Sequence, residues 1–232
     1  MELIWEGFKE SIRLLLSGDA GVLSVVGLSL RVSLTATLVS LFLGVPTGMA
    51  LGLTRFRGRR LIISLVNVSM GLPPVVVGLM VALTLWRSGP LGVLGIMYTP
   101  LAIIIAQTAI ALPIITGLTL AAVQQLNPKI RLQILALGAS RRQMLWLLVR
   151  EARLSILAAA IAGFGGVISE VGASMMVGGN ILWQTRVLTT ATVLETSKGN
   201  FSAALALGTI LFALAYAVTL ALTLVQQREK IL

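Results

Sequence analysis

The chain has 232 residues, of which 57% are apolar and only 11% are charged, against roughly 25% charged for an ordinary soluble domain. This composition excludes a soluble globular domain and predicts an all-α polytopic membrane protein, because runs of about 20 apolar residues cross the bilayer as helices. The net charge of +10 does not indicate nucleic-acid binding, since the Lys and Arg residues gather in the gaps between apolar runs, as membrane topology requires.

Cysteine and histidine are both absent from the chain, so we expect no disulfide, no thiolate chemistry and no metal site. The first 20 residues contain four acidic side chains and lack the basic start of a cleavable signal peptide. Residues 3–16 mix charged side chains of both signs with large apolar ones. This predicts an amphipathic segment over residues 1–21 that lies at the membrane interface and contacts lipid. A sixth, short span in this segment is the less favoured alternative.

Five apolar runs follow, and each is long enough to cross the bilayer. They form one membrane domain over residues 22–225, followed by a short tail over 226–232. The gaps at 55–60 and 127–153, together with the C-terminus, hold 12 of the 18 Lys and Arg residues and share one side. The positive-inside rule therefore places the N-terminus outside and the C-terminus in the cytoplasm of a multi-pass inner-membrane protein. The predicted spans are 32–53, 61–86, 100–123, 154–178 and 203–225.

Small side chains recur at every fourth position of the first predicted span. Helices in lipid gain stability where such residues let two backbones approach closely. Packing within the chain is the favoured interpretation, and a seam between two copies of the chain is the alternative. The residues of this stripe are Ala36, Ser40, Gly44, Gly48 and Gly52.

Proline residues interrupt several of the predicted spans, and the sharpest interruption is the sequence Gly71-Leu72-Pro73-Pro74. Proline lacks the backbone N–H that a helix needs, so it kinks or breaks the helix. Broken helices inside a bilayer often border a transport site. Pro73 and Pro74 are therefore candidate pathway residues, and a purely structural kink is an equally weighted alternative.

The polar side chains within the predicted spans, apart from Ser and Thr, are Asn67, Gln107 and Glu170. An ionisable group at this depth is costly and is a functional candidate by default. For Glu170 we nevertheless favour a structural role, in which the carboxylate accepts hydrogen bonds from backbone amides or pairs with an arginine. These three residues, with Asn180 in the loop that follows, are the candidate pathway or gate residues.

The segment 127–153 is basic and amphipathic, and it separates the third and fourth spans. Its pattern predicts a helix, a turn around Gly138 and a second helix, which is typical of a docking surface rather than of a simple loop. We expect apolar anchors at Ile130, Ile134 and Leu137 to enter a groove on a partner protein. The residues expected to couple the chain to this partner are Gln133, Ala136, Gly138, Ala139, Ser140 and Arg141.

This segment resembles the coupling loop of permease subunits of ATP-binding-cassette importers. Gly138 stands at the position of the glycine in the family's loop, and residues 139–141 also look like the family. The sequence departs from the family in two places. Residues 132–134 replace its Glu-Ala-Ala, and residues 150–151 replace its closing Leu-Pro.

Further strings narrow the resemblance to permeases for oxyanions. Residues 72–78 look like the second span of oxyanion permeases, and residues 170–173 and 178–181 look like their fourth span and outer loop. Residues 150–153 and 186–199 are most similar to tungstate permeases. The resemblance covers nearly the whole chain, about residues 22–225.

The resemblance implies a type I importer permease fold with five spans and a cytoplasmic coupling helix-turn-helix. It implies a homodimer, a cytoplasmic ATPase dimer and an extracytoplasmic oxyanion-binding protein as partners, with tungstate as the substrate and molybdate or sulfate as the alternatives. The chain has no Gly-Lys pair and hence no P-loop, so ATP and Mg are expected in the ATPase. An ion channel or ATP-independent carrier is the alternative from another class, whereas an enzyme would need a catalytic constellation that this sequence lacks.

Overall fold

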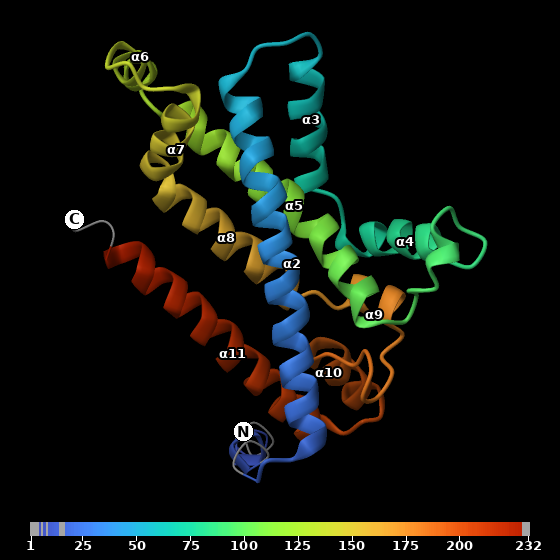
Figure 1. Cartoon of the computed structure of the whole chain (residues 1–232). Helices are drawn as coiled ribbons and strands as arrows, with labels where there is room; N and C mark the ends of the chain where they lie inside the picture. Colours follow the sequence, from blue (N-terminus) through green and yellow to red (C-terminus); the bar gives the residue numbers. More distant parts are fainter. Residues whose placement is uncertain (1–4, 6, 8, 14–16, 229–232) are drawn as a thin grey trace.

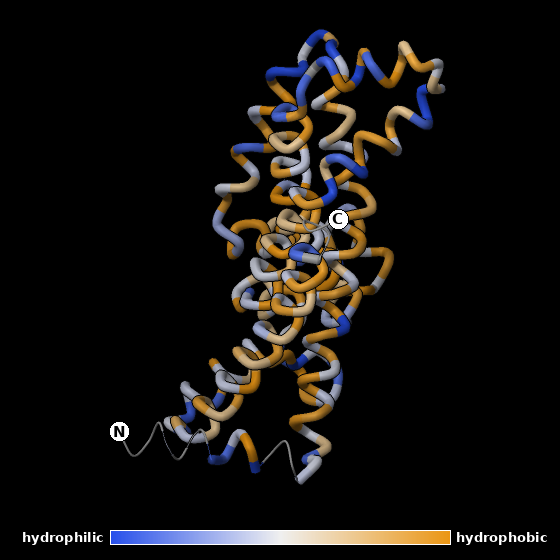
Figure 2. Tube along the Cα trace, turned by 90° about the vertical axis from the view of Figure 1, so that its left-hand side faces the viewer, coloured by the Kyte–Doolittle hydropathy of each residue, from blue (hydrophilic) through white to orange (hydrophobic). Residues whose placement is uncertain are grey.

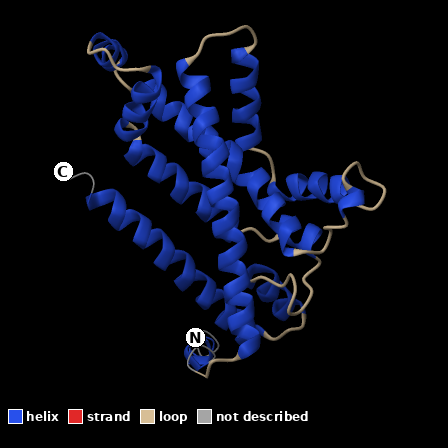
Figure 3. Cartoon of the chain, viewed as in Figure 1, coloured by secondary structure: helices blue, strands red, loops and turns tan. Residues whose placement is uncertain are grey.

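A computed structural model describes residues 17–228 and, before them, residues 5, 7 and 9–13. Figure 3 shows helices and connecting loops without a strand in this described part, which confirms the all-α prediction. The elements are α2 (Ala20–Leu53), α3 (Arg59–Met70), α4 (Pro74–Leu85), the 3-10 helix η1 (Gly92–Leu94), α5 (Pro100–Gln125), α6 (Pro128–Ala136), α7 (Arg141–Glu151), α8 (Arg153–Ile168), α9 (Gly172–Gly178), α10 (Leu188–Ser197) and α11 (Phe201–Arg228).

Three of these helices, α2, α5 and α11, are each long and apolar enough to cross a membrane. Two bent pairs, α3 with α4 and α7 with α8, raise the number to five when each pair counts as one span. Hydrophilic segments gather at the end of the molecule that carries the α2–α3 loop and the α6–α7 hairpin (Figure 2). The chain is therefore a helical membrane protein whose most polar end carries the arginine-rich loops.

Helices α2 and α5 pack closely along the second half of α2, and the small residues of α2 make this approach feasible. A Cβ added at Gly44 would lie 3.0 Å from the Ile115 side chain, and one added at Gly48 would lie 2.6 Å from the carbonyl oxygen of Thr116. The Ser40 hydroxyl donates a hydrogen bond to the Thr108 carbonyl. The stripe on the first span thus packs within the chain, as the favoured interpretation predicted.

The predicted second span, 61–86, is not straight. The chain direction bends by 105° between α3 and α4, and α4 lies across the bundle beside α9 (Figure 1). Pro73 and Pro74 explain the break, because proline removes backbone donors and disfavours helical geometry in the preceding residue. Gly78 allows α4 to approach α9 this closely, because a Cβ at position 78 would lie 2.5 Å from the Cα of Ala173.

The first and last long helices extend beyond the predicted spans. Helix α2 begins at Ala20 rather than at residue 32, because the Asp19 side chain caps it by accepting from the Val22 N–H at 2.9 Å. Its early turns are stabilised by burial of Val25 in a cluster with Leu188 and Ile210. Helix α11 continues to residue 228 and so includes the start of the predicted tail, while 229–232 lie outside the described residues.

The predicted fourth span, 154–178, is also interrupted, because α8 ends at Ile168 and α9 starts only at Gly172. The predicted N-terminal amphipathic segment lies partly outside the described residues. Residues 5, 7 and 9–13 are helical, and Gly7 is buried so close to α11 that a Cβ there would lie 2.5 Å from the Leu205 Cβ. The described part of this segment therefore packs against the bundle.

Candidate functional site

The α6–α7 hairpin projects from the polar end of the bundle (Figure 1). Local sequence builds both of its helices. Asn127 caps α6 by accepting from the Lys129 N–H at 2.9 Å. Ser140 and Gln143 form a capping box at the start of α7, in which each side chain accepts from the other's backbone N–H. These caps satisfy backbone donors that the first turn of a helix leaves unpaired.

The turn between the two helices depends on Gly138, whose φ of +78° lies in the left-handed region. The N–H of Gly138 donates to the Leu135 carbonyl, and the N–H of Ala139 donates to the Ile134 carbonyl. This pair of bonds is a Schellman motif, which ends a helix and usually requires glycine. Nothing lies within 4 Å of a Cβ added at this glycine, so backbone conformation alone favours glycine here.

The hairpin leaves large apolar side chains uncovered. Leu137 is 87% exposed, and Leu132 and Trp146 are also exposed, with the Arg150 guanidinium 5.5 Å from the centre of the Trp146 ring. The predicted coupling residues are exposed, apart from Ala139, which is half-buried; the exposed ones are Gln133, Ala136, Gly138, Ser140 and Arg141. Leu137, Gly138, Ala139 and Trp146 line one hollow at the tip. One surface at the tip of the hairpin therefore combines apolar and cationic groups.

Two of the three predicted anchors lie nearer the contact between α6 and α7, where they also line an open hollow with Leu147 and Arg150. Ile130 and Ile134 are half-buried and pack against a cluster that includes Met144 and Leu148, and only Leu137 is fully uncovered. The helical spacing of these residues identified an apolar stripe correctly. It did not show that this stripe also packs α6 against α7.

The break at Pro73, which the sequence pattern predicted, and the interruption between α8 and α9 meet in space. Val75 at the start of α4 lies against Gly172 at the start of α9. A Cβ added at Gly172 would lie 2.5 Å from the Val75 side chain. Glu170 caps the second break, because its Oε1 accepts from the Ala173 N–H at 2.9 Å and its carbonyl accepts from the Thr189 hydroxyl at 3.0 Å. This is the backbone-bonded arrangement favoured for Glu170.

The two neutral candidates differ in exposure. Gln107 is buried in α5. Its Nε2 donates at 3.1 Å to the carbonyl of Val167, which lies in the last turn of α8. Asn67 is exposed on α3, as is Ser64 one turn before it. Asn67 is therefore the candidate that presents a polar group on an open helix face.

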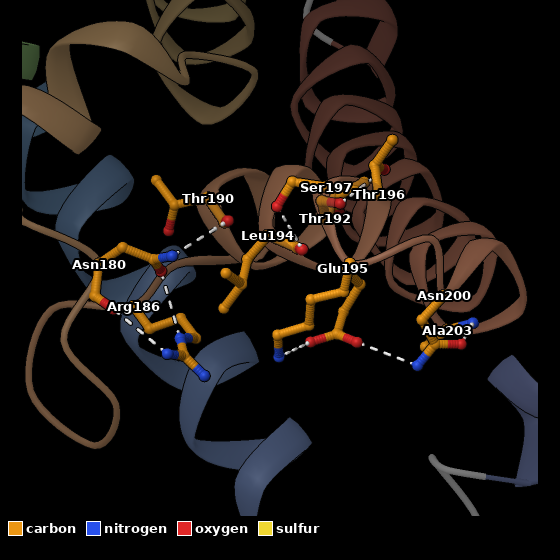
Figure 4. Close-up of polar contacts among 11 residues, drawn as sticks. Asn180, Arg186, Thr190, Thr192, Leu194, Glu195, Thr196, Ser197, Asn200 and Ala203 are labelled. Atoms are coloured by element: carbon orange, nitrogen blue, oxygen red, sulfur yellow. Dashed lines mark hydrogen bonds and ion pairs between the residues drawn. The ribbon is translucent and has the colours of Figure 1, made fainter.

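A polar network orders the loop between α9 and α10. Arg186 donates from Nε to the Asn180 side chain at 3.2 Å and from Nη2 to the Asn180 carbonyl at 3.3 Å (Figure 4). The Asn180 amide in turn donates to the Thr190 carbonyl at 3.4 Å. Asn180 has a φ of +54°, a conformation that asparagine tolerates better than most residues. Asn180, a predicted gate residue, thus shapes this loop.

Beyond this network, Glu195 accepts from Lys198 Nζ at 2.7 Å and from the Asn200 side chain at 3.0 Å (Figure 4). The hydrogen bond from Lys198 is the main cause that lowers the pKa of Glu195, and Asn200 and the charge of Arg186 act in the same direction against partial burial. Sequence reasoning did not select Arg186 or Glu195 as site residues. The three-residue spacing of Glu195 and Lys198 on a helix was the available signal.

Residues 44–231 match the protein family described as binding-protein-dependent transport system inner membrane component. Among similar proteins, a probable anion ABC transporter permease protein of Haloferax volcanii is 43% identical over 202 residues, which cover 85% of this chain and 87% of the relative. More distant matches carry the names of sulfate and molybdenum transport system permeases.

Two further relatives are named as tungstate uptake system permease proteins. The protein of Peptoclostridium acidaminophilum is 39% identical, with 94% of this chain and 96% of the relative covered. The protein of Campylobacter jejuni is 34% identical, with 93% of this chain and 90% of the relative covered. These matches extend over both helix breaks and the hairpin.

Proposed function

We propose that this chain takes up tungstate or a related oxyanion. The proposal starts from the family, because the chain belongs to the binding-protein-dependent transport system inner membrane components. It is a translocation subunit of an ABC importer and a multi-pass protein of the inner membrane. We assign no catalysis to the chain itself. ATP and Mg are bound by a separate ATPase subunit, and an extracytoplasmic binding protein delivers the anion.

The observation that carries this proposal is the α6–α7 hairpin. It is capped at both helix starts, turned by Gly138 and exposed at Leu132, Leu137 and Trp146. Apolar side chains of this size on a polar end of the molecule indicate a protein interface. A groove on the ATPase receives the hairpin tip, and movement of the ATPase subunits reorients the bundle between inward-open and outward-open states.

The pathway forms between two copies of the chain. The described residues of one copy expose Ser64 and Asn67 on α3, and polar groups at membrane depth are costly unless they face water or protein. A second copy facing α3 encloses these groups in a hydrated pathway. Neutral donors suit the passage of a dianion, because a deep cationic trap would hold it. Glu170, turned toward backbone amides, is not expected to repel it.

The orientation follows from charge. The side with the α2–α3 loop, the hairpin and the C-terminus carries most of the Lys and Arg residues, which places it in the cytoplasm and the N-terminus outside. The outer segments 179–201, where Asn180 and Arg186 order the loop, and 87–99 then face the binding protein. We infer that the described residues of the predicted segment 1–21, which pack against the bundle, also contact lipid at the membrane interface.

The test is purification of the tagged chain from its native membrane, followed by mass spectrometry and an uptake assay. We expect about one P-loop ATPase per permease chain. We also expect ATP-dependent uptake of tungstate, which molybdate or sulfate inhibits less effectively than unlabelled tungstate does. Preferential uptake of molybdate or sulfate would reassign the substrate. A homodimer without an ATPase, moving anions without ATP, would support the channel or carrier alternative.

A further inference from the structure

A groove lined by three arginines lies at the polar end of the bundle, between the end of α2, the α2–α3 loop, the end of α5 and the start of α6. Arg55 and Arg59 enter it from the loop and the start of α3, and Arg131 enters it from α6. Gln124 and Asn127 add polar groups. No lining residue is acidic, and no carboxylate pairs with these arginines in the described part of the chain.

Helix capping uses only some of the hydrogen-bond donors of these arginines. Arg59 donates from Nε to the Leu51 carbonyl at 2.7 Å, and Arg131 donates from Nη1 to the Leu53 carbonyl at 3.1 Å. These bonds satisfy carbonyls at the end of α2. A guanidinium carries five N–H donors, so each arginine has further donors to offer, and Arg55 makes no such capping bond. Three like charges around one groove repel each other unless an anion lies between them.

We propose that this groove binds a phosphate group, and that the phosphate belongs to an anionic phospholipid headgroup. Arginine forks match the oxygens of a tetrahedral phosphate, with two parallel hydrogen bonds from one guanidinium. Phe56 favours the lipid as the source. It is exposed among Arg55, Arg59 and Arg60, and an aromatic side chain among basic residues is typical of a membrane surface. Basic clusters beside a span attract anionic lipid in the same way.

A phosphate in the groove would connect two parts of the chain that are distant in sequence. Arg131 belongs to the hairpin, whereas Arg55 and Arg59 belong to the α2–α3 region. The anion therefore braces α6 against the end of α2, in addition to the direct bond from Arg131 to the Leu53 carbonyl. This consequence for coupling rests on the proposed function, whereas binding of the phosphate does not, because binding can be measured without transport.

The test measures the affinity of the full chain, purified in a neutral detergent, for dihexanoyl phosphatidylglycerol, dihexanoyl phosphatidylcholine and inorganic phosphate. Arg55→Gln removes one groove charge, and Arg57→Gln is the matched control, because it removes an arginine of the same loop that does not line the groove. We expect Arg55→Gln to weaken phosphatidylglycerol binding by about fivefold, the effect of one basic residue near an anionic surface. Arg57→Gln should bind as the wild type does.

Phosphatidylcholine, whose headgroup is zwitterionic, should bind more weakly than phosphatidylglycerol. A different outcome is that inorganic phosphate binds as tightly as phosphatidylglycerol does, with the same dependence on Arg55. That result would support the phosphate site but would identify its ligand as soluble phosphate rather than lipid. Equal affinities for wild type, Arg55→Gln and Arg57→Gln, or no binding of any anion, would overturn the proposal. Arg131→Gln removes a groove charge from α6 instead, and the same affinities are then measured if Arg55→Gln does not fold. Absence of tungstate uptake would leave this result unaffected.

Discussion

At Gly138 the backbone conformation, rather than crowding, restricts the side chain. We predict that Gly138→Val abolishes transport while the chain still inserts in the membrane, because a β-branched residue is strained at a φ of +78°. Gly138→Asn is the control, since asparagine tolerates this conformation. Uptake assays and ATPase co-purification measure both variants. Normal uptake by Gly138→Val at normal expression would remove this turn from the docking surface.

The carboxylate of Glu170 acts as a hydrogen-bond acceptor for the Ala173 N–H, and glutamine offers the same acceptor. We therefore predict that Glu170→Gln keeps at least about half of the wild-type uptake. Glu170→Leu leaves a buried N–H unpaired and should destabilise the protein by about 1–3 kcal/mol. Uptake and thermal unfolding in detergent distinguish the two. Complete loss of uptake in an assembled Glu170→Gln complex would indicate that the charge itself is required.

The lowered pKa of Glu195, caused mainly by the Lys198 hydrogen bond, predicts a pH-dependent contribution to stability. A carboxylate whose pKa falls on folding stabilises the protein above its ordinary pKa of 4.5, and this stabilisation disappears as the pH drops through the lowered value. Wild type should unfold at a higher temperature than Glu195→Gln at pH 7, with the difference shrinking in acid. On a Lys198→Met background the difference should be smaller at pH 7; an unchanged difference would assign it to another partner.

At the scale of elements, the contact between α2 and α5 limits what can replace a small residue. We predict that Gly48→Ala destabilises the protein by about 1–3 kcal/mol, because its Cβ would lie 2.6 Å from a backbone carbonyl that cannot move freely. Gly27→Ala on the same helix has open space around it. It should be neutral or stabilising by about 0.5–1 kcal/mol. Thermal unfolding of the two variants tests the prediction, and equal effects would argue against close α2–α5 packing.

At the scale of the whole molecule, α3 should face water on one side and lipid on the other in the assembled protein. The chain has no cysteine, so Asn67→Cys introduces a single thiol. We predict that this thiol reacts with a water-soluble maleimide, whereas the thiol of Leu65→Cys reacts at least about tenfold more slowly, because a thiol in lipid does not ionise. Both positions are exposed in one copy of the chain, so equal rates would contradict a placement of α3 with water on one side and lipid on the other.

The sequence by itself determined the features that depend on neighbouring residues. Composition established a helical membrane protein, Pro73 and Pro74 marked the break in the second span, and the order Gly138, Ser140, Gln143 determined the turn and the cap of α7. Each follows from propensity or from a hydrogen bond across three or four residues. The resemblance to importer permeases rested on such local strings as well.

Only the tertiary structure decided features that join distant parts of the chain. The 105° bend at Pro73 and the packing of α4 on α9 depend on Gly78 meeting Ala173. Ile130 is half-buried because it packs against a cluster that includes residues of α7, and the arginine groove forms where α6 reaches the end of α2. Periodicity identifies an apolar or basic face but not what lies opposite, because that depends on contacts between residues far apart in sequence.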